Sequence, residues 1–319
     1  MYSTFLVPLD GSKLAERALA YAVKLAEAAQ GRLILVRAAI APPPMTIDGL
    51  DWESSQRNAV EESERYLAAV AGSMPSSLAV ETLVAYGRAE ARILQAARSR
   101  QVDVIVMSAH GRTGLTHLVH RSVAEGILAH SQVPVLVVHA RPGKQIDGGD
   151  FDVAAPRVLV PLDGSTLAEA ALEPAGKLLE RGGELVLLGV VEFPKDVLIA
   201  GHGRVLAYID QQVDARTFAT LEWLNGVAHK LRDQYPHAVV STDVRLGCPA
   251  ENIVAAAVEH GVGLIVMATH GRTGVQRAVL GSVTGQVLRS AGAPLLLVHP
   301  RSRATPVQVV ALAPEEVTR

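Results

Sequence analysis

A glycine-rich stretch late in the chain has the residue types that can hold a phosphate group. It runs from Met267 through His-Gly-Arg-Thr-Gly274 to Gly281 and Ser282, where a helix is expected to begin. Glycine lets a backbone approach a ligand closely, and a helix N-terminus presents unpaired N–H groups to an anion. Arg272 adds a charge and Ser282 a hydroxyl. The stretch predicts a phosphate cradle, although it matches neither G-x-x-x-x-G-K-[ST] nor G-x-G-x-x-G.

An aspartate at the end of a strand supplies a second polar group for this predicted site. The carboxylate of Asp163 can accept hydrogen bonds from a ribose hydroxyl or an adenine amino group. Val190 and Met267 offer apolar walls for a base. A purely structural explanation stays open for both polar residues. Aspartate after a strand is often a turn former or N-cap, and Ser282 can simply cap its helix.

The chain carries one domain twice, and each copy must position such a site. The sequence of Val7–Gly11 recurs at Val160–Gly164, and that of His110–Gly114 recurs at His270–Gly274. Repeats of this length indicate duplicated structural units. The second copy is longer before Gly247, which indicates an insertion around residues 194–220. The predicted organisation is a first domain over 1–142, a linker over 143–156, a second domain over 157–300 and a tail over 301–319.

Apolar runs alternate with helical spacings in each half. The first half predicts helices after Ser12 and over 53–71, 89–99 and 123–129, and strands at Phe5–Leu9, Leu33–Val36, Ala79–Ala85, Val102–Met107 and Val135–Val138. This order predicts an α/β fold with a doubly wound, parallel five-stranded sheet in each half. Ligands bind such sheets at the carboxyl ends of the strands, where both repeated peptides fall. Pro174 and Gly176 predict a kink or a late start in the first helix of the second half.

Composition argues against several classes of protein. The chain has 30 basic and 32 acidic side chains and a net charge of −2, so it lacks the basic excess of a dedicated nucleic-acid binder. Cys248 is the single cysteine, which excludes an intrachain disulfide and fits a reducing compartment. No apolar run is long enough to span a bilayer, and the N-terminus lacks the features of a signal peptide. A cytoplasmic protein without a nucleic-acid or membrane partner is expected. His110 and His270 have no second ligand at metal spacing, so no metal site is expected.

The motifs resemble those of the universal stress protein family, and the resemblance covers nearly the whole chain. ATP-binding members carry G-x-x-G, nine residues and then G-[S/T]. The second half reads Ala268-x-x-Gly271, nine residues and Gly281-Ser282, so only the first glycine departs. The first half reads Ser108-x-x-Gly111, nine residues and Arg121-Ser122, and departs twice. Ser122 and Glu125 there also form a ready capping box.

The resemblance implies a Rossmann-like fold of the adenine nucleotide alpha hydrolase type, binding of ATP (alone or with Mg²⁺) and a role in the stress response. The nucleotide contacts implied for the second half are Asp163, Val190, Met267, Ala268, His270, Gly271, Arg272, Gly281, Ser282 and Val283. The weaker first-half candidates are Asp10, Ala38, Met107, Ser108, Gly111, Arg112, Ser122 and Val123. Family members commonly pair through their last strands, so the two halves are expected to pair within the chain about a pseudo-two-fold axis. A homodimer is a further option.

Three functions compete on the sequence alone. The leading hypothesis is a nucleotide-binding stress or regulatory module with one strong site per chain, in the second half, because Arg121 stands where the second half has Gly281. The second is a slow ATP hydrolase or a nucleotidyl transferase of related fold. No base is positioned beside the cradle and no carboxylate cluster for Mg²⁺ is evident, which argues against a fast enzyme and against any catalytic residue. The third is a ligand-free interaction scaffold.

Overall fold

The computed structural model describes residues 2–39, 52–109, 123–139, 151–193, 203–270 and 280–299. Strands and helices alternate in both halves, as the sequence predicts. The first half contains β1 (Thr4–Pro8), α1 (Lys13–Ala29), β2 (Arg32–Ala39), α2 (Trp52–Gly72), β3 (Ala79–Tyr86), α3 (Ala89–Ser99), β4 (Val104–Ala109), α4 (Val123–His130) and β5 (Val135–His139). The second half contains β6 (Arg157–Leu162), α5 (Thr166–Glu169), α6 (Leu172–Leu178), β7 (Gly183–Val191), α7 (Gly203–Gln234), β8 (Ala238–Leu246), α8 (Pro249–Glu259), β9 (Leu264–Ala268), α9 (Ser282–Ser290) and β10 (Leu295–Val298).

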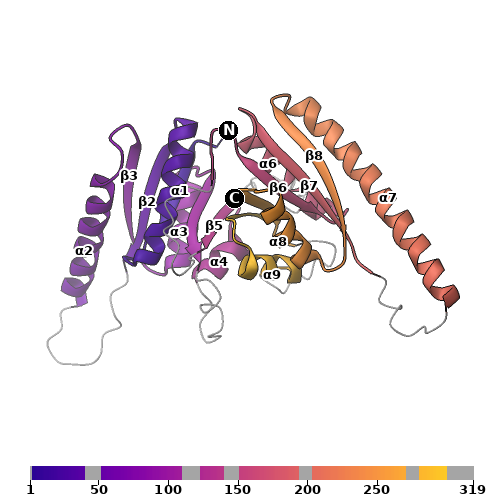
Figure 1. The fold of residues 1–319 in the computed structure, drawn as a ribbon. Coiled ribbons are helices and arrows are strands. Elements are labelled where there is room, and N and C mark those ends of the chain that lie inside the picture. The colour runs from indigo at the N-terminus through magenta and orange to yellow at the C-terminus, as the bar shows by residue number, and fades with distance from the viewer. Residues whose placement is uncertain are drawn as a thin grey trace, which may run out of the picture.

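The ten strands form one sheet in the order β3-β2-β1-β4-β5-β10-β9-β6-β7-β8. Neighbouring strands are parallel within each half, and β5 and β10 join the halves as an antiparallel pair centred on Leu136 and Leu296. Figure 1 shows the halves side by side, with α2 and α7 on the two outer flanks. The predicted α/β fold and the pairing of the last strands are confirmed, and the two five-stranded sheets prove to be one continuous sheet.

Strand side chains alternate between two helical layers. On β1, Phe5 and Val7 belong to the core cluster that includes residues of α1, α2, α6 and α7, whereas Leu6 belongs to the cluster that includes residues of α3, α4, α8 and α9. Successive strand residues point to opposite faces, so a parallel sheet covered on both sides needs apolar residues at every central position. This requirement explains the continuous apolar runs, and it leaves only the strand ends for polar chemistry.

The first helices of the two halves begin alike and then diverge. Ser12 caps α1 and Ser165 caps α5, each accepting a hydrogen bond of 3.1 Å from the backbone N–H three residues later. In the second half the helix stops at Glu169 and a second helix, α6, starts at Leu172. Pro174 lies in the first turn of α6, where a proline is tolerated. The predicted interruption is therefore a full break between two short helices.

The second half is longer because of one helix. α7 has 32 residues, against 21 in α2, its counterpart before the third strand. The predicted insertion around 194–220 therefore falls largely in helix α7, whose N-terminal part extends along the flank of the molecule in Figure 1.

Side chains from both halves meet beside the central strands. The Tyr2 hydroxyl donates a hydrogen bond of 3.4 Å to the Pro174 carbonyl, and burial raises the pKa of that hydroxyl. Phe151, within the predicted linker, is 3% exposed and its ring lies 6.4 Å from that of Tyr21. The end of the linker is therefore packed into the core between the halves.

Candidate functional site

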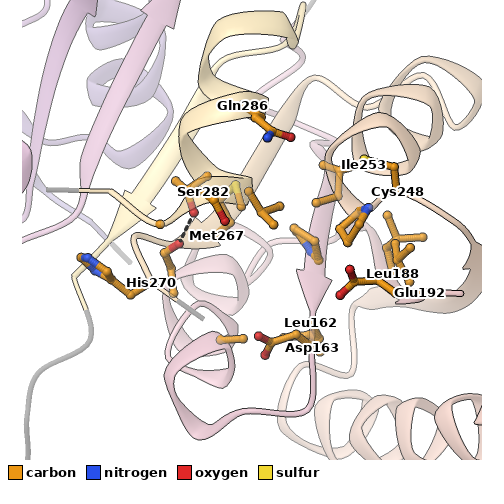
Figure 2. Close-up of a pocket in the computed structure, with 18 residues that line it drawn as sticks. Leu162, Asp163, Leu188, Glu192, Cys248, Ile253, Met267, His270, Ser282 and Gln286 are labelled. Atoms are coloured by element: carbon orange, nitrogen blue, oxygen red, sulfur yellow. Dashed lines mark hydrogen bonds between the residues drawn. The ribbon is translucent and has the colours of Figure 1, made fainter. Parts of the chain in front are cut away.

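A cavity of about 590 Å³, here called the second crevice, opens at the carboxyl ends of β6, β7 and β9. The starts of α8 and α9 complete its wall (Figure 2). The predicted nucleotide contacts that line it are Asp163, Val190, Met267, Ala268, His270, Gly281, Ser282 and Val283. Gly271 and Arg272 lie outside the described residues. The fold thus gathers residues that are more than 100 positions apart in the sequence around one space, and whether they bind a nucleotide stays a prediction.

Two hydrogen bonds hold the first turn of α9 against the end of β9. The Gly281 N–H donates to the Thr269 carbonyl at 2.8 Å. The buried hydroxyl of Thr284 donates to the Ala268 carbonyl at 3.0 Å, the contact dashed in Figure 2. These bonds fix the helix start relative to the strand end, which is the arrangement a phosphate cradle requires.

Gly281 is the N-cap of α9, and Ser282 is the first residue of the helix proper. Gly281 has no side chain that can accept a hydrogen bond from the first-turn N–H groups, and Ser282 does not occupy the capping position. The alternative that Ser282 simply caps its helix is therefore wrong. A Cβ atom on Gly281 would lie 3.3 Å from the Thr269 carbonyl oxygen, so the backbones approach closely here. Among the described residues no side chain caps this helix start, which suits it to an anion.

Asp163 does form a turn, as the structural alternative held. Its Oδ1 accepts hydrogen bonds from the Ser165 N–H at 3.0 Å and from the Ser165 hydroxyl at 2.6 Å. The same residue lines the second crevice, and Figure 2 shows it across Met267 from Ser282. Turn formation and ligand contact are compatible, because a carboxylate has room for about four hydrogen bonds.

Several lining residues were not singled out from the sequence as contacts. Glu192 follows β7, Cys248 occupies the N-cap position of α8 without a side-chain capping bond, and Gln286 lies one turn into α9. No spacing rule connects these residues to the glycine-rich stretch, although Cys248 stands at a visible helix start. Among the described residues no three His, Cys, Asp or Glu side chains gather as a metal site.

A comparable cavity of about 550 Å³, here called the first crevice, opens at the matching strand ends of the first half. The predicted contacts Asp10, Ala38, Met107, Ser108 and Val123 line it. Gly111, Arg112 and Ser122, together with Arg121, lie outside the described residues, so the proposed Ser122–Glu125 capping box does too. The Ser108 hydroxyl donates a hydrogen bond of 2.7 Å to the Leu14 carbonyl of α1, which gives that departure from the family motif a structural role.

The first crevice also contains a cation that the sequence did not single out. The Arg37 side chain is 18% exposed and lies 3.6 Å from a Glu62 carboxylate oxygen. Its guanidinium lies 4.9 Å from the centre of the Tyr66 ring. Burial and the Glu16 carboxylate raise the pKa of the Tyr66 hydroxyl to about 12. Burial opposes ionisation of Asp10, but hydrogen bonds from Ser12 and the charge of Arg37 lower the pKa of its carboxyl.

No helix among the described residues has the length and apolar character needed to cross a membrane.

Comparison with known proteins assigns the family. The universal stress protein family (Usp) model matches residues 1–139 and 155–299. A universal stress protein of Mycolicibacterium smegmatis is 28% identical over 250 residues, 78% of either chain. Universal stress protein Rv1996 of Mycobacterium tuberculosis is 27% identical over 341 residues, which cover 94% of this chain and 96% of the relative. The crystal structure of a universal stress protein from Archaeoglobus fulgidus has the same fold, with a TM-score of 0.66 at 22% identity over 93% of this chain and 98% of that one. The chain therefore belongs to the universal stress protein family and carries one Usp domain in each half.

Proposed function

We propose that the second crevice binds ATP and that the protein is a cytoplasmic stress-response module whose nucleotide occupancy regulates its shape or its partners. The observation that carries this proposal is the placement of an uncapped helix start opposite a strand-end carboxylate in one cavity. Gly281 and Ser282 form the helix start, and Asp163 supplies the carboxylate. A phosphate accepts hydrogen bonds from helix N–H groups, whereas a ribose or adenine donates to a carboxylate.

The walls between these two ends suit a base. Val190, Met267 and Ile253 supply apolar surface, and the cavity volume is within the roughly 300–1,000 Å³ usual for small-molecule sites. Any Mg²⁺ would be held mainly by the phosphates, because the described lining offers no cluster of carboxylates.

The same lining favours binding over rapid turnover. Fast phosphoryl transfer needs a group that orients the nucleophile and acids that hold the metal. Asp163 is already engaged by Ser165, and the other lining carboxylate, Glu192, comes from the end of β7. We expect ADP release far slower than the roughly 10 s⁻¹ typical of enzymes.

The test is to identify and then quantify the ligand. Mass spectrometry of the supernatant after denaturing the purified chain should reveal an adenine nucleotide, and calorimetry on the stripped chain should give about one tight ATP site. Absence of a nucleotide together with no heat on adding Mg-ATP would overturn the proposal. An ADP-release assay on the same sample measures turnover, and a rate near the enzymatic value that is lost in Asp163→Ala would show that the protein is a catalyst.

A further inference from the structure

Arg37 of the first half and Gly189 of the second half occupy the same position. The repeat matches Pro8 with Pro161, and strand register pairs Pro8 with Val36 and Pro161 with Leu188. The residues that follow Val36 and Leu188 are therefore equivalent. One crevice has a guanidinium at the end of its second strand, and the other has no side chain there.

The helix that packs against this position also differs between the halves: it is α2 in the first half and α7 in the second. A Cβ atom on Gly189 would lie 2.6 Å from Thr220 Cγ2 and 3.1 Å from Leu224 Cδ1, so α7 packs directly on the strand. In the first half α2 instead offers Glu62 and Tyr66 to the Arg37 guanidinium. The first crevice accordingly extends to the α2 residues Ala59, Glu62 and Ser63, whereas none of the described α7 side chains lines the second.

The Arg37 guanidinium lies at the Asp10 end of the first crevice. A Cβ atom built on Gly11 would be 3.6 Å from both of its terminal nitrogens. Arg37 lines the cavity together with Asp10 and Ala38, which match Asp163 and Val190 of the second crevice. The cation is thus placed where the proposed ATP site would hold the base and ribose, at the opposite end from the helix start.

A neutral base carries no negative charge that could pair with this cation. The Arg37 side chain is already largely enclosed. Of its acidic neighbours, Glu62 is 71% exposed and 3.6 Å away, and Asp10 interacts with it only through its charge. A purine ring placed against the guanidinium would strip its remaining water and supply no negative charge in return. Removing solvent from an incompletely paired charge is unfavourable, and such a cost is a usual means of rejecting a ligand.

We infer that Arg37 is the residue that sets the ligand specificity of the first crevice by excluding adenine nucleotide from it. This inference rests on the proposed function of the second crevice. It adds a barrier at the base end to the Arg121 difference at the phosphate end.

The experiment counts ATP sites by calorimetry in four chains: wild type, Arg37→Gly, Arg121→Gly, and the double variant. Arg121 lies outside the described residues, and its replacement serves only to restore the glycine of the second half. We expect one site per chain in the wild type and in Arg121→Gly, and two in the double variant. Adding Gly281→Arg to the double variant should leave one site, in the first half. Gly189→Arg, the converse change, is unsuitable because α7 leaves no room for it.

Each result decides the inference. A second site in Arg121→Gly alone, or only one site in the folded double variant, would overturn it. If near-UV circular dichroism shows that Arg37→Gly does not fold, Arg37→Ala removes the guanidinium without placing a glycine in the strand, and the same two outcomes apply. A wild-type chain with no site at all refutes the proposed function instead, so the two failures remain distinguishable.

Discussion

The two crevices are built on the same strand ends and helix starts, but they differ in the side chains at two matching positions. Both place an aspartate after the first strand, a serine cap on the following helix and a cavity of similar size, about 550 and 590 Å³. The second crevice has glycine at 189 and 281, whereas the first has arginine at the matching positions 37 and 121. The shared features are those that the strand-to-helix turn needs, so their presence in both halves says little about ligands.

The hydrogen bonds beside the two cradles also differ between the halves. Thr284 ties α9 to the end of β9, but the matching residue of α4 is Ala124, which has no hydroxyl. In the first half the hydroxyl is on the strand instead, where Ser108 bonds to Leu14 of α1. The second half therefore fixes the helix start, and the first half fixes the strand end to a different helix. The two cradles are therefore anchored by different contacts.

The largest expected effect is that of Gly281→Arg on ATP binding. The new side chain would occupy the space beside the helix start and remove at least two charge-assisted hydrogen bonds to phosphate. At about 1.5–3 kcal/mol each, their loss weakens binding by roughly 100-fold or more. Gly226→Arg on α7 is the matched control, because it adds the same side chain where no atom lies within 4 Å of the new Cβ.

Calorimetry measures both variants, and thermal unfolding of the ligand-free chains checks the fold. Gly281→Arg carries some cost in stability, because its Cβ would lie 3.3 Å from the Thr269 carbonyl oxygen. Wild-type affinity in a folded Gly281→Arg chain would show that the second crevice is not the ATP site.

The next largest effect compares Asp163 with Asp10, its counterpart in the first half. Asp163→Asn keeps an oxygen that can accept from Ser165, so the turn survives, but it removes the charge available to a bound ribose or adenine. We expect ATP binding to weaken roughly 10- to 100-fold, as for loss of a hydrogen bond to a charged group. Asp10→Asn, the matched change in the first half, should leave ATP binding unchanged. Equal losses in the two variants would contradict the one-site hypothesis.

The third effect concerns packing at the position that distinguishes the crevices. Gly189→Ala would force a Cβ to within 2.6 Å of Thr220 Cγ2 and should destabilise the protein by about 1–3 kcal/mol, as overpacking does. Gly226→Ala serves as the control, since its surroundings are open and alanine favours a helix. The midpoint of urea unfolding measures both. An unchanged midpoint in Gly189→Ala would mean that α7 yields easily, and that the Arg37/Gly189 difference is not enforced by packing.

A smaller effect tests the role of Ser282. Because Gly281 is the N-cap, Ser282→Ala should leave the free energy of unfolding within about 0.5 kcal/mol of wild type. Loss of one hydroxyl hydrogen bond should weaken ATP binding by roughly 2- to 10-fold. A loss of about 1 kcal/mol in stability with unchanged affinity would restore the capping role instead.

The fold was predictable because the apolar runs mark its strands and the repeated peptides show that the same unit occurs twice. Phe5–Leu9 and its counterpart mark buried parallel strands, and the repeat fixes the same topology twice. The antiparallel β5–β10 pair was expected only from the resemblance to a family, because nothing in Val135–Val138 states which strand lies beside it. Pro174 predicted a kink or a late helix start, because its ring cannot be accommodated in a helix interior, and the structure has a full break between α5 and α6 instead.

The candidate site was less predictable. A sequence motif describes the local backbone, but it does not say which helix packs against that backbone. Gly281 and Asp163 were found by position in a pattern, whereas Arg37 looked like any polar residue near a strand end. Only the register of β2 and the position of α2 place Arg37 inside the first crevice. The same limit applies to His299, which directly follows β10. The structure leaves it exposed but sets its ring 6.1 Å from that of His270.

The smallest expected effect follows from this histidine pair and distinguishes the halves once more. Partial burial lowers the pKa of His299, and His270 and His130 lower it further. The residue that matches His130 in the second half is Ser290, so the repeat does not duplicate this third histidine. A histidine with a depressed pKa in the folded state binds its proton more readily in the unfolded chain. Stability should therefore decline as pH falls through the ordinary value of 6.5.

His299→Asn should make that decline shallower, because the asparagine cannot take up a proton. Melting temperatures of wild type and variant, compared at pH 7.5 and at successive values below 6.5, measure the difference. His229→Asn is the control: His229 is exposed on α7, 3.8 Å from Asp233, and its replacement should not flatten the acid decline. If His299→Asn and wild type lose stability in parallel as pH falls, the acid sensitivity lies in other groups, and the meeting of His270, His299 and His130 does not distinguish the two halves.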